Sequence, residues 1–206
     1  MKKLTLLMII PIILLSFKAE TPKVLMFIQD NSYDTGYMLK NEAGLMKQIL
    51  QESGFTVEIA TLSGELLNSD SISIQPDLKL SEANVKNYAG FIIPCMAAKD
   101  TVITPEERRF VKSITEQNKP LAAETGAVLI LAKAGLLKGK KYAFVESYVN
   151  QWKTDFEGAI FSGEGVIRDG NIMTSGICPM QTKMYGKANG TAELTKMLVE
   201  AMKAEK

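Results

Sequence analysis

Histidine is absent from all 206 residues of this chain. It is the most common general base and the most common metal ligand in proteins. Its absence therefore excludes Ser-His and Cys-His catalytic pairs within the chain. An excess of charge of one sign is also absent, because 24 basic and 23 acidic residues leave a net charge of +1. We therefore expect no nucleic-acid partner.

Cysteine is scarce, with only Cys95 and Cys178. Two cysteines without histidine do not complete a usual zinc set, so no metal and no cofactor are expected. The residues leave three interpretations of the pair open. The two cysteines form a disulfide across two loops, they are buried free thiols, or Cys95 is a relocated nucleophile.

One long apolar run is present, at the N-terminus. Lys2 and Lys3 precede the apolar stretch 4–17, which is shorter than the roughly 20 residues that span a bilayer. This pattern is typical of a signal peptide, predicted over residues 1–19, although the small-residue rule for cleavage is poorly met. The sequence thus predicts an exported protein, periplasmic or secreted, with an uncleaved membrane anchor as the alternative.

Short apolar runs alternate with amphipathic segments along the rest of the chain. This order predicts a three-layer α/β sandwich over residues 23–206, in which helices cover both faces of a mainly parallel, flavodoxin-like sheet. Thr104 and Glu107 predict a capped helix start. Asp169 and Gly170 predict a small added hairpin. The predicted strands cover 23–29, 55–60, 89–94 and 120–123, and the predicted helices centre on 39–50, 104–114, 127–134 and 194–201.

Ligand sites of open parallel sheets form beyond the carboxyl ends of the strands. Three segments are predicted to end together at that edge, namely 94–96, 124–126 and 175–179. The candidate pocket residues there are Met96, Glu124, Gly126 and Cys178.

The stretch 119–141 contains a strand, a sharp turn at Thr125, an apolar helix and the turn Ala-Gly-Leu-Leu-Lys-Gly-Lys-Lys, which begins at Ala134. In this order, together with the strand that ends at Pro94, these motifs resemble the PfpI-type protease and parkinsonism-associated deglycase family. That family belongs to the class I glutamine amidotransferase-like superfamily. The resemblance covers about residue 23 to the C-terminus.

The resemblance also implies where the family's functional residues fall. The nucleophilic cysteine falls on Thr125, and the histidine that often follows it falls on Gly126. The helix-one glutamate that hydrogen-bonds the cysteine matches Glu42. The Gly-Gly pair that helps to form the oxyanion pocket is Cys95-Met96 in this chain. The glutamate is therefore kept, whereas the other groups are changed.

In the family, the nucleophile lies on a sharp, strained strand-to-helix turn, here called the elbow. Threonine is an unfavourable residue for such a turn, because β-branched residues rarely adopt positive φ. We therefore predict a relaxed turn at Thr125, whose hydroxyl caps the helix 127–134. The alternative is a threonine nucleophile activated by Glu42, but an alcohol needs a stronger base. Glu124 is predicted to point away from Thr125, either adding a second carboxylate to the pocket or pairing with a lysine.

Two functions follow from these expectations. The first is a catalytically degenerate family member that binds a small ligand or self-associates. The second is a hydrolase or a glyoxalase/deglycase-like enzyme, which acts on a carbonyl or amide substrate through Cys95 or Thr125 with Glu42. The resemblance further implies a homo-oligomer.

Overall fold

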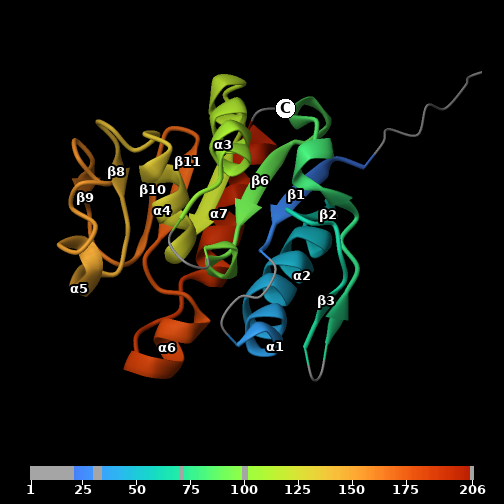
Figure 1. The fold of residues 1–206 in the computed structure, drawn as a ribbon, viewed down its shortest axis with the longest axis horizontal. Coiled ribbons are helices and arrows are strands. Elements are labelled where there is room, and N and C mark those ends of the chain that lie inside the picture. The colour runs from blue at the N-terminus through green and yellow to red at the C-terminus, as the bar shows by residue number, and fades with distance from the viewer. Residues whose placement is uncertain (1–20, 30–33, 70–71, 99–101, 205–206) are drawn as a thin grey trace, which may run out of the picture.

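The computed structural model describes residues 21–29, 34–69, 72–98 and 102–204. The predicted signal peptide lies outside these residues. A seven-stranded sheet forms the middle layer, in the order β10-β11-β7-β6-β1-β2-β5 (Figure 1). All neighbouring strands are parallel except the β10–β11 hairpin. The strands are β1 (Lys23–Phe27), β2 (Thr56–Thr61), β5 (Leu78–Lys79), β6 (Gly90–Ile93), β7 (Leu121–Glu124), β10 (Val166–Asp169) and β11 (Ile172–Ser175).

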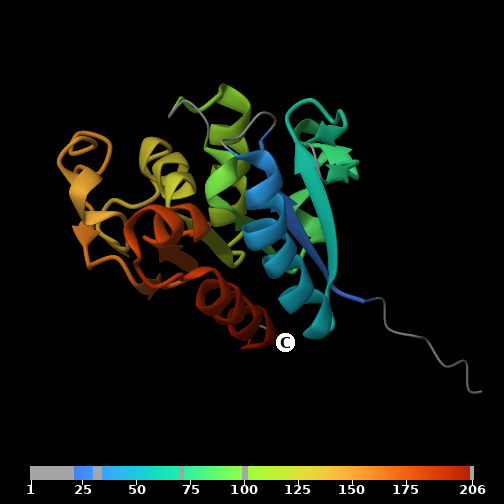
Figure 2. The ribbon, with the colours of Figure 1, turned by 90° about the horizontal axis from the view of Figure 1, so that it is seen from below.

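Helices cover both faces of the sheet, which confirms the predicted α/β sandwich. Figure 2 shows α2 and α7 on one side and α3 and α4 on the other. The helices are α1 (Thr35–Met38), α2 (Gly44–Glu52), α3 (Pro105–Glu116), α4 (Gly126–Lys133), α5 (Glu146–Val149), α6 (Pro179–Tyr185) and α7 (Thr191–Ala204). A π-helical segment (Leu39–Ala43) joins α1 to α2, and short 3-10 turns cover Leu80–Glu82, Val85–Asn87 and Cys95–Ala97.

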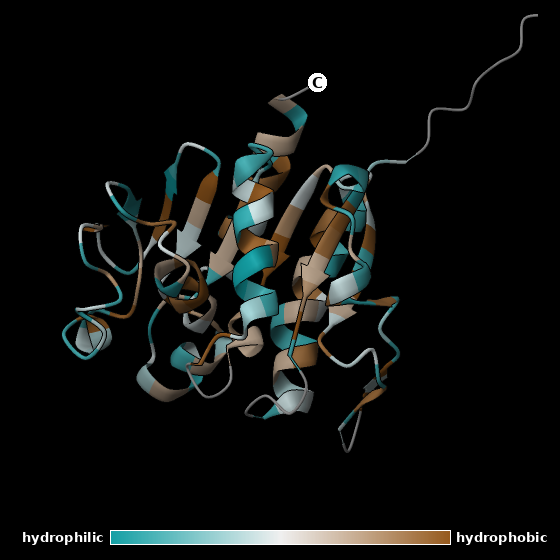
Figure 3. Ribbon diagram, turned by 45° about the horizontal axis from the view of Figure 1, so that its top comes forward, coloured by the Kyte–Doolittle hydropathy of each residue, from teal (hydrophilic) through white to brown (hydrophobic). Residues whose placement is uncertain are grey.

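The central strand β1 explains why the sheet is buried on both faces. Successive side chains of a strand point to opposite faces. Val24 and Met26 pack in the apolar cluster with α2 and α7, whereas Leu25 and Phe27 pack in the cluster with α3 and α4. All four are at most 1 % exposed. The hydrophobic colouring of the central strands in Figure 3 follows from this double burial.

Helix α3 begins as the sequence predicts. The Thr104 hydroxyl accepts a hydrogen bond from the Glu107 amide at 3.1 Å, and the Glu107 carboxylate accepts one from the Thr104 amide at 2.6 Å. Pro105 occupies the first helical turn, where its missing N–H removes no helical hydrogen bond. The predicted capping box is confirmed.

A small lobe beside β10 was not predicted. Its strands β8 (Lys141–Tyr142) and β9 (Ile160–Phe161) pair in parallel, and Figure 1 shows them at the left edge of the molecule together with α5. The Tyr142 ring stacks on Phe156 at 4.3 Å between centroids. At the other end of the sheet, β3 (Leu67–Asn68) and β4 (Ser73–Ile74) form a separate two-stranded pair.

Within the described ranges, no helix combines the length and the apolar character needed to cross a membrane.

Candidate functional site

The carboxyl ends of β6, β7 and β11 lie side by side, because the three strands are parallel neighbours. The segments that follow them carry Cys95, Thr125 and Cys178, respectively. The structure therefore brings together the three segments that the sequence placed at this edge. Glu42 reaches the same place from the π-helical segment.

The backbone at Thr125 is strained, with φ 44° and ψ −105°. The prediction of a relaxed turn was wrong. The Thr125 amide donates to the Ser175 carbonyl at 2.7 Å, which ties the turn to the neighbouring strand end. The Val128 amide donates to the Thr125 carbonyl at 3.0 Å and starts α4. These backbone bonds fix a positive φ despite the β-branched side chain, and strain of this kind costs about 1–3 kcal/mol.

The Thr125 hydroxyl does not cap α4, contrary to the prediction. It donates instead to the Gly176 carbonyl at 3.1 Å, and the Cys178 sulfur lies within reach of the same hydroxyl. A hydroxyl has one proton, so it serves one of these acceptors at a time. Thr125 is only 3 % exposed. A carbonyl oxygen cannot take the hydroxyl proton, so these contacts do not activate Thr125 as a nucleophile.

Glu42 lies in the π-helical segment, a helix form that is frequent at functional sites. The Gly44 amide donates to the Leu39 carbonyl, five residues back. A Cβ at Gly44 would lie 2.9 Å from that carbonyl oxygen, so glycine allows this wide turn. The side chain of Glu42 is fully buried.

The Glu42 carboxylate holds the loop after β6. It accepts hydrogen bonds from the Cys95 amide at 2.7 Å and the Met96 amide at 3.3 Å. These are the two amides at the positions where the resemblance placed the oxyanion-pocket glycines. Because Glu42 binds both of them, they are engaged within the protein and do not point at an empty oxyanion position.

Glu124 forms a buried carboxyl pair with Glu42. Its oxygens also accept hydrogen bonds from Thr191 at 2.9 Å and Ser175 at 3.3 Å. The sequence left two outcomes open for Glu124. The structure shows it as a second carboxyl group beside Glu42, and these contacts do not pair it with a lysine. Burial raises the pKa of Glu124 to about 8. Burial, followed by the charges of Glu124 and Cys178, raises the pKa of Glu42 well above its usual value.

Cys95 and Cys178 are free thiols, so the disulfide that the sequence left open is not formed. Their sulfur atoms hydrogen-bond each other. This bond and burial raise the pKa of Cys95 well above its usual value. The same bond, assisted by the amides of Gln181 and Met180, lowers the pKa of Cys178 to about 7. Cys178 is fully buried, whereas Cys95 is half-buried.

Gly126 lies under the loop that carries Cys95. A Cβ at this position would lie 3.1 Å from the Ala98 Cβ and 3.3 Å from the Cys95 carbonyl oxygen. The space for a side chain is therefore filled. The loop after β6 and a histidine at position 126 exclude each other in this arrangement.

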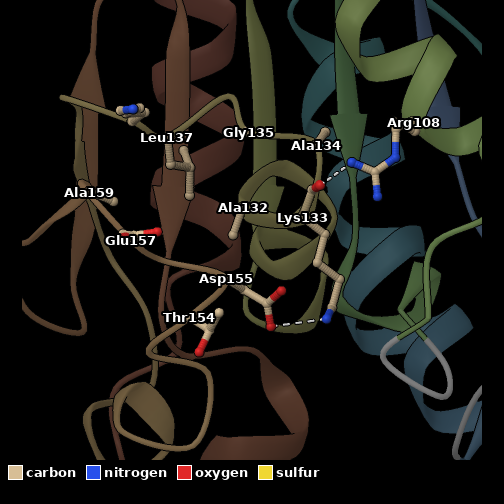
Figure 4. A pocket seen from close by; sticks show the side chains of 11 residues that line it. Arg108, Ala132, Lys133, Ala134, Gly135, Leu137, Thr154, Asp155, Glu157 and Ala159 are labelled. Carbon is tan, nitrogen blue, oxygen red and sulfur yellow. Dashed lines mark hydrogen bonds and ion pairs between the residues drawn. The ribbon is translucent and has the colours of Figure 1, made fainter.

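A hollow of about 330 Å³ lies at the opposite end of α4 (Figure 4). The figure shows Lys133 paired with Asp155 and Arg108 reaching the Lys133 carbonyl. Helix α4 has eight residues, which corresponds to about 12 Å. Glu42, Cys95, Glu124, Thr125 and Cys178 form what is here called the strand-end cluster. The hollow is separate from this cluster, and none of the sequence-predicted site residues lines it.

Sequence reasoning missed two features of the cluster. It named Cys95 as the reactive thiol, whereas Cys178 has the lower pKa. Pro179 begins helix α6 directly after Cys178, and this pattern could have indicated a lowered thiol pKa, because amides at the start of a helix stabilise a thiolate. It also missed Thr191 and Ser175 as partners of Glu124. No local sequence pattern marks these contacts, because Ser175 lies 51 positions and Thr191 lies 67 positions from Glu124 in the chain.

Comparison with known proteins places these features in context. A model of the DJ-1/PfpI family matches residues 22–185. An uncharacterized protein from Archaeoglobus fulgidus is 30% identical over 130 residues, which are 61% of this chain and 75% of that protein.

Solved structures are also similar. A ThiJ/PfpI domain protein from Brachyspira murdochii has a TM-score of 0.68 at 15% identity, over 90% of this chain and 98% of that one. Drosophila melanogaster DJ-1beta has a TM-score of 0.67 at 20% identity, over 89% of this chain and 91% of that one. At these identities the two structures support the fold alone.

Proposed function

Because the chain belongs to the DJ-1/PfpI family, we propose that it is an exported member whose elbow no longer performs nucleophilic chemistry and whose strand-end cluster binds a small ligand. One observation carries this proposal. Glu42, whose carboxylate would have to activate the Thr125 hydroxyl, binds the amides of Cys95 and Met96 instead.

The elbow lacks two components of acyl or carbonyl chemistry. An alcohol needs a well-placed base, and the Thr125 hydroxyl donates to a carbonyl oxygen. Stabilisation of a developing oxyanion needs amides that point at the reacting atom. The amides of Cys95 and Met96 point at Glu42. Loss of one oxyanion donor alone costs about 100-fold to 1000-fold in rate.

Binding is the role that the remaining features support. Members of the family often form oligomers and bind small substrates, which also makes self-association part of the proposal. The cluster combines carboxyl and thiol groups, and Cys95 is its half-buried member. Export is proposed from the lysine pair and the apolar run within residues 1–19.

The substitution Thr125→Cys tests the loss of elbow chemistry. It restores the residue type that the resemblance places at the elbow and leaves the Glu42 hydrogen bonds in place. We expect no robust turnover of methylglyoxal or of peptide substrates by either the wild type or this variant. Thr125→Ser is the matched control, because it keeps the hydroxyl without the β-methyl group. Strong turnover by the wild type would contradict the proposal. Strong turnover by the cysteine variant alone would show that the missing thiol, and not the Glu42 contacts, accounts for the loss.

A second candidate function is an enzyme that uses a thiol beside the elbow. The contact between the two thiols favours it, because Cys178 receives hydrogen bonds from Cys95 and from backbone amides. Iodoacetamide labelling of the folded protein under reducing conditions, read by peptide mass, separates the two candidates. Binding without catalysis predicts slow labelling, with Cys95 ahead of buried Cys178. Labelling much faster than that of a free thiol at the same pH supports the enzyme.

A further inference from the structure

Three side chains with metal-ligand chemistry meet at the strand ends. They are Glu42 from the π-helical segment, Cys95 after β6 and Cys178 after β11. One carboxylate oxygen and the two sulfur atoms all lie within 4.8 Å of one another. The sequence predicted no metal, because two cysteines without histidine are too few ligands. The fold supplies a third ligand from a segment that is 53 residues away from Cys95.

This set of two sulfur atoms and one oxygen restricts the type of cation. Ca²⁺ takes about six to eight oxygen ligands, and Mg²⁺ also requires oxygen. An iron–sulfur cluster usually takes about four cysteines. Zn²⁺ accepts both thiolate and carboxylate, with Zn–S near about 2.3 Å and Zn–O near about 2.1 Å. Ligand atoms of a zinc tetrahedron therefore lie about 3.4–3.8 Å apart. The three ligand atoms lie within 4.8 Å of one another, so shortening the longest separation by about 1 Å brings them to the spacing of a zinc tetrahedron.

The electrostatics of the cluster independently favour a cation. Glu42 and Glu124 are both fully buried. In the described part of the chain, their hydrogen-bond partners are backbone amides, hydroxyls and each other, with no lysine or arginine among them. Buried carboxylates are normally paired with a cation or coordinate a metal ion, and otherwise they become neutral through a raised pKa. Burial raises the pKa values of both groups in the metal-free protein, and a divalent cation would allow Glu42 to be buried as a carboxylate.

We propose that Glu42, Cys95 and Cys178 bind one Zn²⁺ ion, with the fourth coordination position open on the half-buried Cys95 side. Glu124 orients Glu42 through their shared hydrogen bond, as carboxylates beside metal ligands commonly do. Zinc replaces the two thiol protons and the proton that the raised pKa keeps on Glu42, and these protons pass to the solvent. Three protein ligands and one open position are typical of sites where zinc also holds water or a small molecule. The inference deepens the proposed binding role by naming the ligand of the same cluster.

Calorimetric titration of the full chain tests the proposal. The protein is first stripped with a chelator and kept under a phosphine reductant, and Zn²⁺ is then added. We expect one equivalent to bind, and each of the variants Cys95→Ser and Cys178→Ser to weaken binding by at least about 100-fold. Glu42→Gln is expected to weaken it by at least about 10-fold. Glu58→Gln is the matched control, because it alters a carboxylate that pairs with Lys23 away from the cluster.

Co²⁺ serves as a spectroscopic probe of the same site. We expect thiolate-to-cobalt charge-transfer absorption and the visible bands of a tetrahedral ion in the wild type, and weaker charge transfer in each cysteine variant. Thermal unfolding in the presence of chelator shows whether the variants still fold. Zinc should raise the Tm of the wild type and raise the Tm of a folded Cys178→Ser variant much less at the same zinc concentration.

The absence of one-to-one binding, unchanged affinity in Cys178→Ser, or a cobalt spectrum without thiolate charge transfer would each overturn the zinc site. These results are independent of the test of the proposed function. Turnover by the metal-free wild type would refute the loss of elbow chemistry and leave the zinc titration standing. Failure to bind zinc would leave the elbow result standing.

Discussion

The elbow at Thr125 and the thiol pair at Cys95 and Cys178 occupy neighbouring strand ends, but different forces fix them. Backbone hydrogen bonds hold the elbow, and φ is positive there even though threonine disfavours it. Side-chain contacts hold the thiol pair, namely the bonds of Glu42 to the loop after β6 and the contact between the two sulfur atoms. The fold thus keeps the backbone shape of the elbow even with an unfavourable side chain at position 125. The reactivity of the site depends instead on the side chains that surround the elbow.

The largest expected effect comes from forcing a side chain between the two regions. Gly126→His places the residue that the resemblance implies beneath the Cys95 loop, where a Cβ alone is already 3.1 Å from Ala98. We expect the variant to lose about 3 kcal/mol of unfolding free energy, because overpacking forces the loop away. Denaturant unfolding measures this loss. Gly126→Ala is the control, with a smaller loss expected. Equal stability of the histidine variant and the wild type would show that the loop moves freely.

The next effect concerns the carboxyl pair beside the thiols. The pKa of Glu124 is raised to about 8 in the folded state. Its stabilising contribution is therefore complete below the unfolded pKa of about 4.5 and is lost as pH rises through about 8. In metal-free protein, we expect the free energy of unfolding to fall by about 2 kcal/mol between about pH 6 and about pH 8.

Glu124→Gln separates this contribution from other titrating groups, because its amide carries no proton that titrates in the interval. Denaturant unfolding at several pH values should show a smaller fall for the variant than for the wild type. Parallel pH profiles of the two proteins would mean that Glu124 titrates normally in the folded state.

A smaller effect concerns the elbow itself. Thr125→Gly and Thr125→Ala remove the same hydroxyl and differ only at Cβ. At an ordinary helix position alanine is more stable than glycine by about 0.5–1 kcal/mol. At positive φ the order should reverse, so we expect the glycine variant to be more stable by about 1 kcal/mol. If chemical denaturation showed the alanine variant to be the more stable of the two, the strained backbone at Thr125 would be refuted.

The scaffold could be predicted from local patterns, whereas the site could be predicted only in part. The apolar run of β1 and the Thr104 capping box depend on neighbouring residues, so the sequence displays them. The relaxed turn at Thr125 was a wrong prediction, because intrinsic backbone preference was given more weight than the tertiary hydrogen bond to Ser175. Here the surrounding structure overrides the preference of a single residue.

The arrangement of the cluster also required the fold. Glu42 was placed near the pocket from the resemblance, but its π-helical setting depends on a close approach at Gly44. The contact between Glu42 and Glu124 joins two segments 82 positions apart (124 − 42). No periodic pattern encodes such a contact, because it arises where separate strand ends converge. The small lobe with β8 and β9 escaped prediction because two-residue strands are too short to show a period.

Acylation by p-nitrophenyl acetate, followed by peptide mass mapping, tests most directly whether the elbow has lost its chemistry. This activated ester transfers an acetyl group to a nucleophilic hydroxyl or thiol. We predict that the peptide containing Thr125 stays unmodified in folded protein and that any acetyl group is found on Cys95. Rapid acetylation of Thr125 that disappears in the Glu42→Gln variant would contradict this account, because it would show that Glu42 activates the elbow.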